Sequence, residues 1–216
     1  MLIPCLITAL AAYLIGSFPT GYLVGRARGV DLRSLGSGNI GATNALRILG
    51  KPAGIFVLLV DGAKGLGGVA LVPHIGRALG GATASETGSV WLPVLGGVSA
   101  VLGHNFTCWL KFRGGKGIAT SAGVLAGLMP LAFVTVVATF VVTILIFRIV
   151  SLGSIVAAAV LPAATWFWHR DPVLVGFSAA LALLAVWRHR ANIRRLRDGT
   201  EPRIGQSRAI PGVPRP

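Results

Sequence analysis

Residues 118–147 read IATSAGVLAGLMPLAFVTVVATFVVTILIF, an uncharged apolar stretch interrupted near its middle by Pro130. As one α-helix this stretch would be about 45 Å long, whereas the hydrocarbon core of a bilayer is about 30 Å thick. A proline inside a helix also removes one backbone hydrogen bond and crowds the preceding turn. We therefore expect two helices here, over 118–129 and 131–147.

Five further apolar segments lie along the chain, at 2–25, 53–73, 90–108, 149–168 and 173–187. A helix needs about 20 residues to cross a bilayer, and most of these segments have that length. Hydrophobic residues make up 54% of the chain and charged residues only 12%, which does not fit a water-soluble surface. The sequence predicts an all-α, polytopic integral membrane protein with about seven transmembrane helices.

The positions of lysine and arginine indicate the orientation, because short loops rich in these residues stay on the cytoplasmic side. With seven spans and the N-terminus outside, only Arg77 and Arg170 fall in outer loops. The inner clusters lie at 26–51, 111–116, 148 and 188–215. A single helix over 118–147 would move the last cluster outside and remove the bias. We therefore expect the C-terminus in the cytoplasm.

The net charge of +14 follows from these inner clusters. Anionic lipid headgroups and phosphorylated metabolites lie on that side of a membrane. A basic chain with so little mass outside the bilayer is not expected to bind nucleic acid. Neither Cys5 nor Cys108 has the neighbours of a metal site, so we expect no metal and no cofactor.

The first polar segment is GSGNIGATNALR at 36–47. Glycines let the backbone approach a ligand closely, so that successive N–H groups can converge on an anion. The side chains of Ser37, Asn39, Thr43 and Asn44 add hydrogen-bonding groups. If a helix begins near Thr43, its N-terminus favours an anion, and Arg47 can bind two phosphate oxygens one turn later. The alternative is a Gly/Asn turn that only joins two spans.

The second segment is FRGGKGIAT at 112–120, which enters a predicted span. It lacks the Ser or Thr that follows the lysine in nucleotide-binding phosphate loops, because Gly117 stands there, and no strand precedes it. A glycine-rich turn at a helix N-terminus with the point charge of Lys116 still suits a phosphate. The alternative is a basic inner loop without a function.

The third segment is RHRANIRRL at 188–196, followed by GTE at 199–201. On a helix, His189 and Asn192 are three residues apart and lie on one face, so both can point at one ligand. The alternative is a basic amphipathic helix that lies on anionic lipid.

Two charged residues, Asp61 and Lys64, stand one helical turn apart inside a predicted span. Charges at this depth are costly unless they are paired, so we expect them to pair with each other or to line the site. No histidine has an aspartate five residues later, as in the common soluble-type glycerolipid acyltransferases. The serine-hydrolase elbow is also absent. A nucleophile supplied by the protein is therefore not expected.

The three segments, in this order, resemble the bacterial acyl-phosphate:glycerol-3-phosphate acyltransferase family, known as PlsY. The resemblance includes GH at 103–104 and extends over nearly the whole chain. It implies transfer of an acyl group from acyl phosphate to the 1-hydroxyl of glycerol 3-phosphate, the first step of phospholipid biosynthesis. The products would be 1-acylglycerol 3-phosphate (lysophosphatidic acid) and inorganic phosphate. Residues 1–202 would form a single transmembrane catalytic domain, and 203–216 a flexible cytoplasmic tail.

The resemblance also implies roles for individual residues. Glycerol phosphate and neighbouring anions would be bound by Ser37, Thr43, Arg47, Lys116, His189 and Asn192. The acyl phosphate would be held by the N–H groups of Gly114, Gly115 and Gly117. Further candidates for substrate binding are Asn39, Asn44, His104 and Glu201. The proton of the attacking hydroxyl would pass to a substrate phosphate oxygen, with His189 as a rival base.

The same resemblance implies a setting for the protein. It would lie in the bacterial inner or plasma membrane among membrane lipids, with its site facing the cytoplasm. The enzyme that forms acyl phosphate and the second acyltransferase of the pathway would be its partners. The alternative functions are a transporter for phosphorylated metabolites and a headgroup-binding protein. A transporter is expected to show repeat symmetry and polar groups at the bilayer midplane, whereas the polar segments here lie at one face.

Overall fold

The computed structural model describes residues 2–80 and 90–205, and within these ranges the regular elements are all helices. The chain forms two compact units, one up to residue 128 and one from residue 129 onward. Each is considered by itself. The predicted tail at 203–216 falls outside the described residues from 206 on, so its flexibility stays a prediction.

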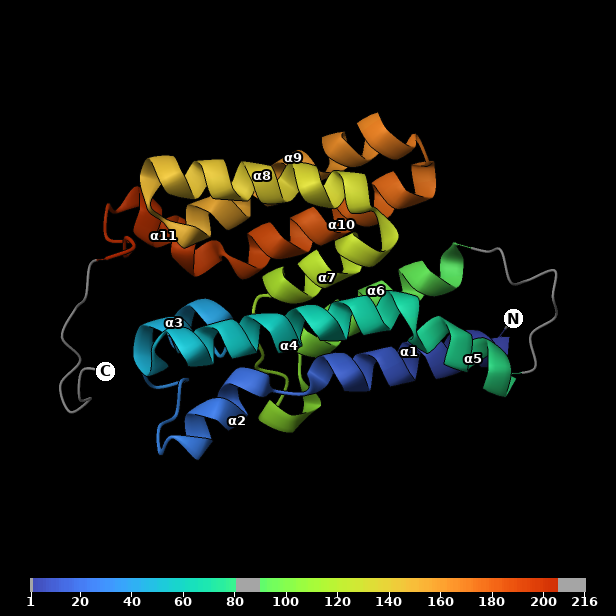
Figure 1. Cartoon of the computed structure of the whole chain (residues 1–216), viewed down its shortest axis with the longest axis horizontal. Helices are drawn as coiled ribbons and strands as arrows, with labels where there is room; N and C mark the ends of the chain where they lie inside the picture. Colours follow the sequence, from blue (N-terminus) through green and yellow to red (C-terminus); the bar gives the residue numbers. More distant parts are fainter. Residues whose placement is uncertain (1, 81–89, 206–216) are drawn as a thin grey trace. The chain divides into compact units, whose positions relative to one another are not determined.

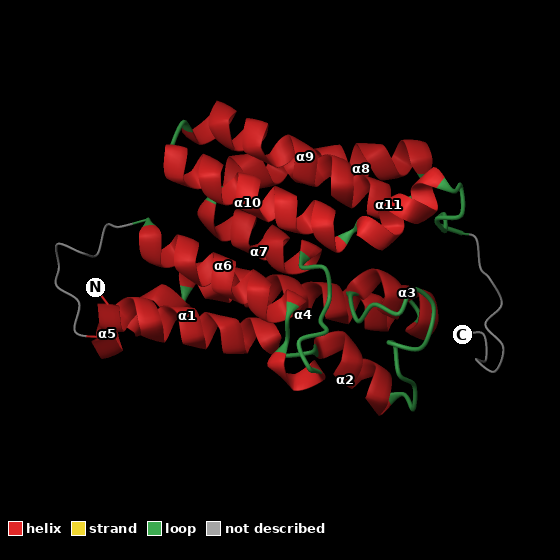
Figure 2. Ribbon diagram, turned by 180° about the vertical axis from the view of Figure 1, so that it is seen from behind, coloured by secondary structure: helices red, strands yellow, loops and turns green. Residues whose placement is uncertain are grey.

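The first unit is built around two long helices that pack on several shorter ones (Figure 1). Its elements are α1 (Leu2–Ser17), α2 (Thr20–Ala27), α3 (Ala42–Leu49), α4 (Lys51–Ala70), α5 (Val72–Gly80), α6 (Trp91–Asn105), the short 3-10 helix η2 (Cys108–Leu110) and α7 (Ile118–Leu128). Helix α1 packs against α5 and α6, and α4 packs against α3, α6 and α7. Among the described residues of this unit, the longest irregular segments are the loops that lead into α3 and α7 (Figure 2).

Glycines let the helices of the first unit approach one another closely. A Cβ atom on Gly16 of α1 would lie 2.1 Å from the carbonyl oxygen of Ala100 in α6. A Cβ atom on Gly65 of α4 would lie 1.9 Å from the carbonyl oxygen of Thr120 in α7. Contact through small residues is the usual way in which helices pack in a membrane, where apolar side chains gain little by leaving lipid.

The second unit holds α8 (Pro130–Phe147), α9 (Val150–His169), α10 (Pro172–Arg188) and α11 (Arg190–Arg197). Helix α9 packs against both α8 and α10. Asp171 caps α10 by accepting hydrogen bonds from the N–H groups of Val173 and Leu174. The axis bends by 58° between α10 and α11, so the basic C-terminal helix does not continue the apolar one.

The predicted division near Pro130 is confirmed, because α7 ends at Leu128 and α8 begins at Pro130. Each of the seven predicted apolar segments contains a helix. By length and apolar composition alone, four of the described helical stretches could cross a membrane, or five if the bent pair of α10 and α11 counts as one span. Helices α6 and α7 have only 15 and 11 residues. The number of spans and the orientation of the termini therefore stay predictions.

Candidate functional site

The loop before α3 is held in place by a single amide side chain. Asn44 is 1% exposed, and its Oδ1 accepts a hydrogen bond from the N–H of Ser37. Its Nδ2 donates to the carbonyl oxygens of Leu32 and Leu35. Gly36 has a φ of 60°, and a Cβ atom there would lie 2.4 Å from Asn44 Oδ1. Asn44, predicted to bind substrate, thus uses its amide to shape the loop.

The other polar groups of this segment surround the start of α3. The helix begins at Ala42, as predicted, and no side chain caps its first turn. The side chains of Ser37, Thr43 and Arg47 are exposed, and Thr43 and Arg47 stand four residues apart on one face. Asn39 accepts a hydrogen bond at Oδ1 from the N–H of Gly41. An anion at this helix start would meet backbone N–H groups, hydroxyls and a guanidinium together.

A short ion pair stiffens the chain just before this loop. The side chain of Arg33 donates to both carboxylate oxygens of Asp31, and the backbone N–H of Arg33 donates to one of them. These hydrogen bonds lower the pKa of Asp31 to about 2. The carboxylate therefore stays ionised over the physiological range, and it pairs with Arg33.

The loop before α7 lies directly against the end of α6. The N–H of Gly114 donates to the carbonyl oxygen of Asn105, and the N–H of Gly115 donates to that of His104. A Cβ atom on Gly114 would lie 2.0 Å from the His104 carbonyl oxygen. Both amides thus hold the loop, and they could serve a ligand, as predicted, only by giving up these bonds. Gly117 has a φ of 78° immediately before α7 begins, as the predicted turn requires.

His104 lies beneath this loop, and Lys116 is carried by it. The side chain of His104 is 6% exposed, and a Cβ atom on Gly115 would lie 2.1 Å from its Nε2. Lys116 is half-buried next to the N-terminus of α7. The first unit therefore has two glycine-rich loops that each lead into a helix, with Arg47 in the last turn of α3 and Lys116 just before α7.

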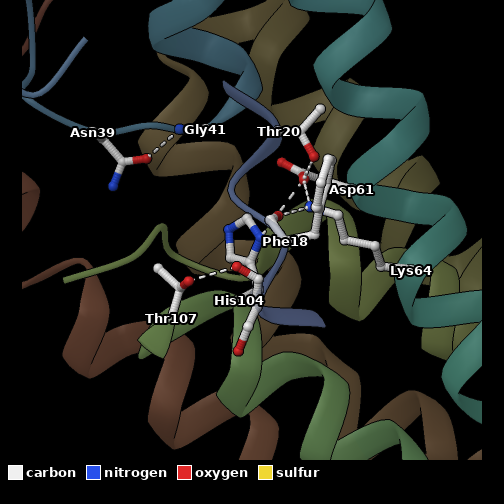
Figure 3. Close-up of polar contacts among 9 residues, drawn as sticks. Phe18, Thr20, Asn39, Gly41, Asp61, Lys64, His104 and Thr107 are labelled. Atoms are coloured by element: carbon white, nitrogen blue, oxygen red, sulfur yellow. Dashed lines mark hydrogen bonds and ion pairs between the residues drawn. The ribbon is translucent and has the colours of Figure 1, made fainter. Parts of the chain in front are cut away.

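Asp61 and Lys64 pair, in agreement with the sequence-based prediction (Figure 3). Lys64 Nζ lies 2.6 Å from Asp61 Oδ1, and both side chains are buried within α4. The hydroxyl of Thr20 donates to the same oxygen at 3.0 Å, and Lys64 also donates to the carbonyl oxygen of Phe18. This pair therefore supports the break between α1 and α2.

In the second unit, Glu201 holds α11 to the start of α9. Its Oε1 accepts hydrogen bonds from Ser151 Oγ and Asn192 Nδ2, each at 2.6 Å. Its Oε2 accepts from Arg195 Nε, also at 2.6 Å. Burial by itself would raise the pKa of Glu201, but the hydrogen bonds from these three side chains outweigh it and lower the pKa. Glu201, predicted to bind substrate, thus orients Asn192.

His189 stands at the bend between α10 and α11, where it ends one helix and precedes the other. It is 2% exposed, and its Nδ1 lies 2.7 Å from the carbonyl oxygen of Ala185. Because a carbonyl oxygen can only accept, Nδ1 must carry a hydrogen. Nε2 is then an acceptor in the neutral ring and a donor in the charged ring. His189 can therefore either take a proton or bind an anion.

Two contacts were not foreseen from the sequence. Ser151 belongs to an apolar segment and gave no signal of a partner at Glu201. Thr107 donates to the carbonyl oxygen of Ser17 at the end of α1, a contact between residues 90 positions apart. In the sequence, only the charge of Arg195 and the GTE motif indicated that Glu201 has hydrogen-bonding partners. No group of His, Cys, Asp or Glu among the described residues has the geometry of a metal site.

The comparisons with known proteins agree with one another. The family described as glycerol-3-phosphate acyltransferase matches residues 6–199. A glycerol-3-phosphate acyltransferase of Geobacter sulfurreducens is 46% identical over 199 residues, which cover 92% of this chain and 97% of that protein. One of a Synechococcus species is 45% identical over 205 residues, covering 93% and 94%.

Solved structures give the same result. The crystal structure of PlsY, an integral membrane glycerol 3-phosphate acyltransferase, in its glycerol 3-phosphate form, matches with a TM-score of 0.83 and 33% identity. The match covers 93% of this chain and 96% of that chain. The lysophosphatidic acid form of PlsY matches with a TM-score of 0.80 and 32% identity.

Proposed function

Because this chain belongs to the glycerol-3-phosphate acyltransferase family of integral membrane proteins, we propose that it uses an acyl phosphate as the donor. The acyl group is transferred to the 1-hydroxyl of glycerol 3-phosphate. The products are 1-acyl-sn-glycerol 3-phosphate and inorganic phosphate, and the reaction is the first step of phospholipid biosynthesis. The observation that carries this proposal is the pair of glycine-rich loops in the first unit. Each leads into a helix and has a cation nearby, Arg47 one turn after Thr43 within α3 and Lys116 just before α7.

Two phosphorylated substrates need such a site. Each brings negative charge, and the two repel each other unless cations and N–H donors lie between or around them. The first turn of α3 with Arg47 offers one such place, and the start of α7 with Lys116 offers the other. Ser37, Thr43 and Asn39 add polar groups at the first place. In the second unit, His189 and Asn192 supply further groups for the substrates.

The reaction does not require a nucleophile supplied by the protein. The 1-hydroxyl oxygen attacks the acyl carbonyl carbon, and the bond from that carbon to the phosphate oxygen breaks. The phosphate leaves with the electron pair of that bond, and the hydroxyl proton passes to a phosphate oxygen of a substrate. Acyl phosphate is already activated, so orientation and charge stabilisation can supply much of the rate. His189 Nε2 is the rival acceptor for the proton.

The surroundings of the protein belong to the same proposal. We place it in the bacterial inner or plasma membrane with the site facing the cytoplasm, because glycerol 3-phosphate is soluble and the basic loops follow the positive-inside pattern. The acyl chain stays on the lipid side. An enzyme that forms acyl phosphate supplies the donor, and a second acyltransferase consumes the product.

The test is phosphate release by the purified protein in lipid vesicles. Palmitoyl phosphate is supplied with and without glycerol 3-phosphate, and palmitoyl-coenzyme A is supplied as a second donor. We expect phosphate release only when both palmitoyl phosphate and glycerol 3-phosphate are present, with an equal amount of lysophosphatidic acid. A folded protein that acylates glycerol 3-phosphate from the coenzyme A thioester but not from acyl phosphate would contradict the donor assignment.

A further inference from the structure

The first span breaks within the described part of the first unit, and a buried charge pair lies at the break. Helix α1 ends at Ser17 and α2 begins at Thr20. Lys64 donates to the carbonyl oxygen of Phe18, and Asp61 accepts from the hydroxyl of Thr20 (Figure 3). Asp61 and Lys64 thus satisfy polar groups that the break exposes. This accounts for the pair as a support of the fold.

The Asp61–Lys64 pair also faces the side chain of His104. This contact is not needed to support the break between α1 and α2. His104 Nδ1 lies 3.8 Å from Asp61 Oδ1, and both side chains are buried (Figure 3). At this separation and burial, the carboxylate attracts the Nδ1 edge of the ring when Nδ1 carries a hydrogen. Lys64 and Asp61 are the charged side chains that α4 presents to this edge, and Thr20 is the polar group from α2. The opposite edge of the ring therefore points away from Asp61.

That opposite edge meets the loop that carries Lys116. A Cβ atom on Gly115 would lie 2.1 Å from His104 Nε2, so the ring lies in contact with the loop backbone. The N–H of Gly115 also donates to the His104 carbonyl oxygen at 3.0 Å. His104 therefore touches Gly115 through both its ring and its backbone. Lys116 is the next residue along the chain.

We propose that Asp61 and Lys64 are positioning residues for the Lys116 loop and that they act on it through His104. Asp61 orients the imidazole, and Lys64 holds the Asp61 carboxylate in place. The ring then supports the backbone of Gly115, which sets where the ammonium group of Lys116 lies. That this position matters for turnover rests on the proposed function, whereas the positioning itself does not.

The cost of burying these charges supports a role beyond packing. A buried ion pair is often replaced by apolar residues of similar volume without loss of stability, because desolvation offsets much of the attraction. Thr20 alone could be satisfied by an uncharged acceptor. Asp61 Oδ1 lies 3.8 Å from His104 Nδ1, too far for a hydrogen bond, so the influence of the carboxylate on the ring is electrostatic.

The test is amide hydrogen exchange of the full-length protein in lipid nanodiscs, without substrate. The variants are His104→Ala, which leaves the charge pair intact, and Asp61→Asn with Lys64→Met, which removes both charges at once. We expect the amides of residues 112–117 to exchange about tenfold faster in both variants. A tenfold change corresponds to the free energy of about one lost hydrogen bond. Combining all three substitutions is expected to add no further increase.

Asn44→Ala is the matched control, because it removes the acceptor of the Ser37 N–H in the other glycine-rich loop. Asn44→Ala is expected to speed amide exchange over 36–44 and to leave exchange over 112–117 unchanged. The other variants are expected to speed exchange over 112–117 and to leave 36–44 unchanged. Wild-type exchange over 112–117 in His104→Ala would overturn the proposal. Faster exchange in both loops of every variant would also overturn it, since that indicates general loosening.

Turnover is a separate measurement on the same samples. If the wild-type protein uses acyl phosphate, the charge-free double variant is expected to lower kcat by about tenfold or more, with no further loss when His104→Ala is added. If the wild-type protein shows no turnover, the proposed function fails, while the exchange data still decide whether the loop is positioned as inferred.

Discussion

Arg47 and Lys116 are the cations that accompany the two glycine-rich loops, Arg47 one turn after Thr43 in α3 and Lys116 just before α7. If each meets a phosphate in the transition state, Arg47→Ala or Lys116→Ala is expected to lower kcat by about a hundredfold or more. Arg47→Lys is the matched variant, since it keeps the charge and loses the planar fork, and an intermediate loss is expected. The measurement is phosphate release with acyl phosphate and glycerol 3-phosphate. Near-normal rates in a folded protein would remove these two assignments.

His189 allows binding to be separated from proton transfer. Gln is uncharged and cannot take up the proton, but it keeps a side chain that can donate and accept hydrogen bonds. If His189 is the general base, His189→Gln is expected to lower kcat by about 10²–10⁴-fold. If a substrate phosphate takes the proton, the main effect is a rise in KM for glycerol 3-phosphate. Steady-state rates over a range of glycerol 3-phosphate concentrations distinguish the two.

Asn44 and Glu201 each have a structural role that the sequence did not predict. Both are polar residues within or beside motifs, and both were predicted to touch substrate. The Asn44 amide bonds Ser37, Leu32 and Leu35, and both carboxylate oxygens of Glu201 accept from side chains of its own unit. Substrate binding by either residue stays a prediction. A motif indicates that a residue matters, but only the geometry separates contact with a ligand from support of one.

Helix α11 depends on Glu201 for its attachment in the second unit. Because the pKa of Glu201 is lowered in the folded protein, its contribution to stability is present above the ordinary value of 4.5. The contribution is lost as the pH falls below 4.5 through the folded-state pKa. Glu201→Gln is expected to speed amide exchange over 190–197 about tenfold at neutral pH, the size of one charge-assisted hydrogen bond.

The difference between wild type and Glu201→Gln is expected to shrink as the pH falls below 4.5, because the Glu201 carboxyl group of the wild type then becomes neutral, like the amide of the variant. Asp198→Asn is the control, since Asp198 is an exposed acidic residue at the end of the same helix. It is expected to leave exchange over 190–197 unchanged at every pH. An effect of Asp198→Asn as large as that of Glu201→Gln would point to net charge rather than to the Glu201 contacts.

The molecule as a whole is predicted to place its basic loops in the cytoplasm. In a protein that carries Cys5→Ala and Cys108→Ala, the single substitutions Ser34→Cys and Arg170→Cys report on the two sides of the membrane. We expect a membrane-impermeant maleimide added to intact spheroplasts to label Arg170→Cys but not Ser34→Cys. Inverted vesicles are expected to show the reverse. Labelling of both positions from one side would contradict the seven-span orientation.

Short helices explain why the number of spans needs this experiment. Helices α6 and α7 have 15 and 11 residues, fewer than the ~20 that cross a bilayer untilted. Both end or begin at a loop whose backbone is satisfied inside the protein, through Gly114, Gly115 and Thr107. Such segments are tolerated at membrane depth where they are buried in protein. The length of an apolar helix alone therefore does not decide whether α6 and α7 count as membrane spans.

The sequence by itself determined the all-helical membrane fold, the division at Pro130, the helix starts at Ala42 and Ile118 and the pairing of Asp61 with Lys64. All of these depend on residues close together in the chain, where hydrophobic length, proline and helical spacing act directly. The tertiary structure alone decided the break of the first span, the contact of His104 with Gly115 and the joining of Ser151, Asn192 and Arg195 at Glu201. These contacts join residues on different helices or loops, some of them 46 or 50 positions apart, as for Lys64 with Phe18 and Ser151 with Glu201. Hydrogen-bonding groups choose such partners only once packing has brought them within about 3 Å.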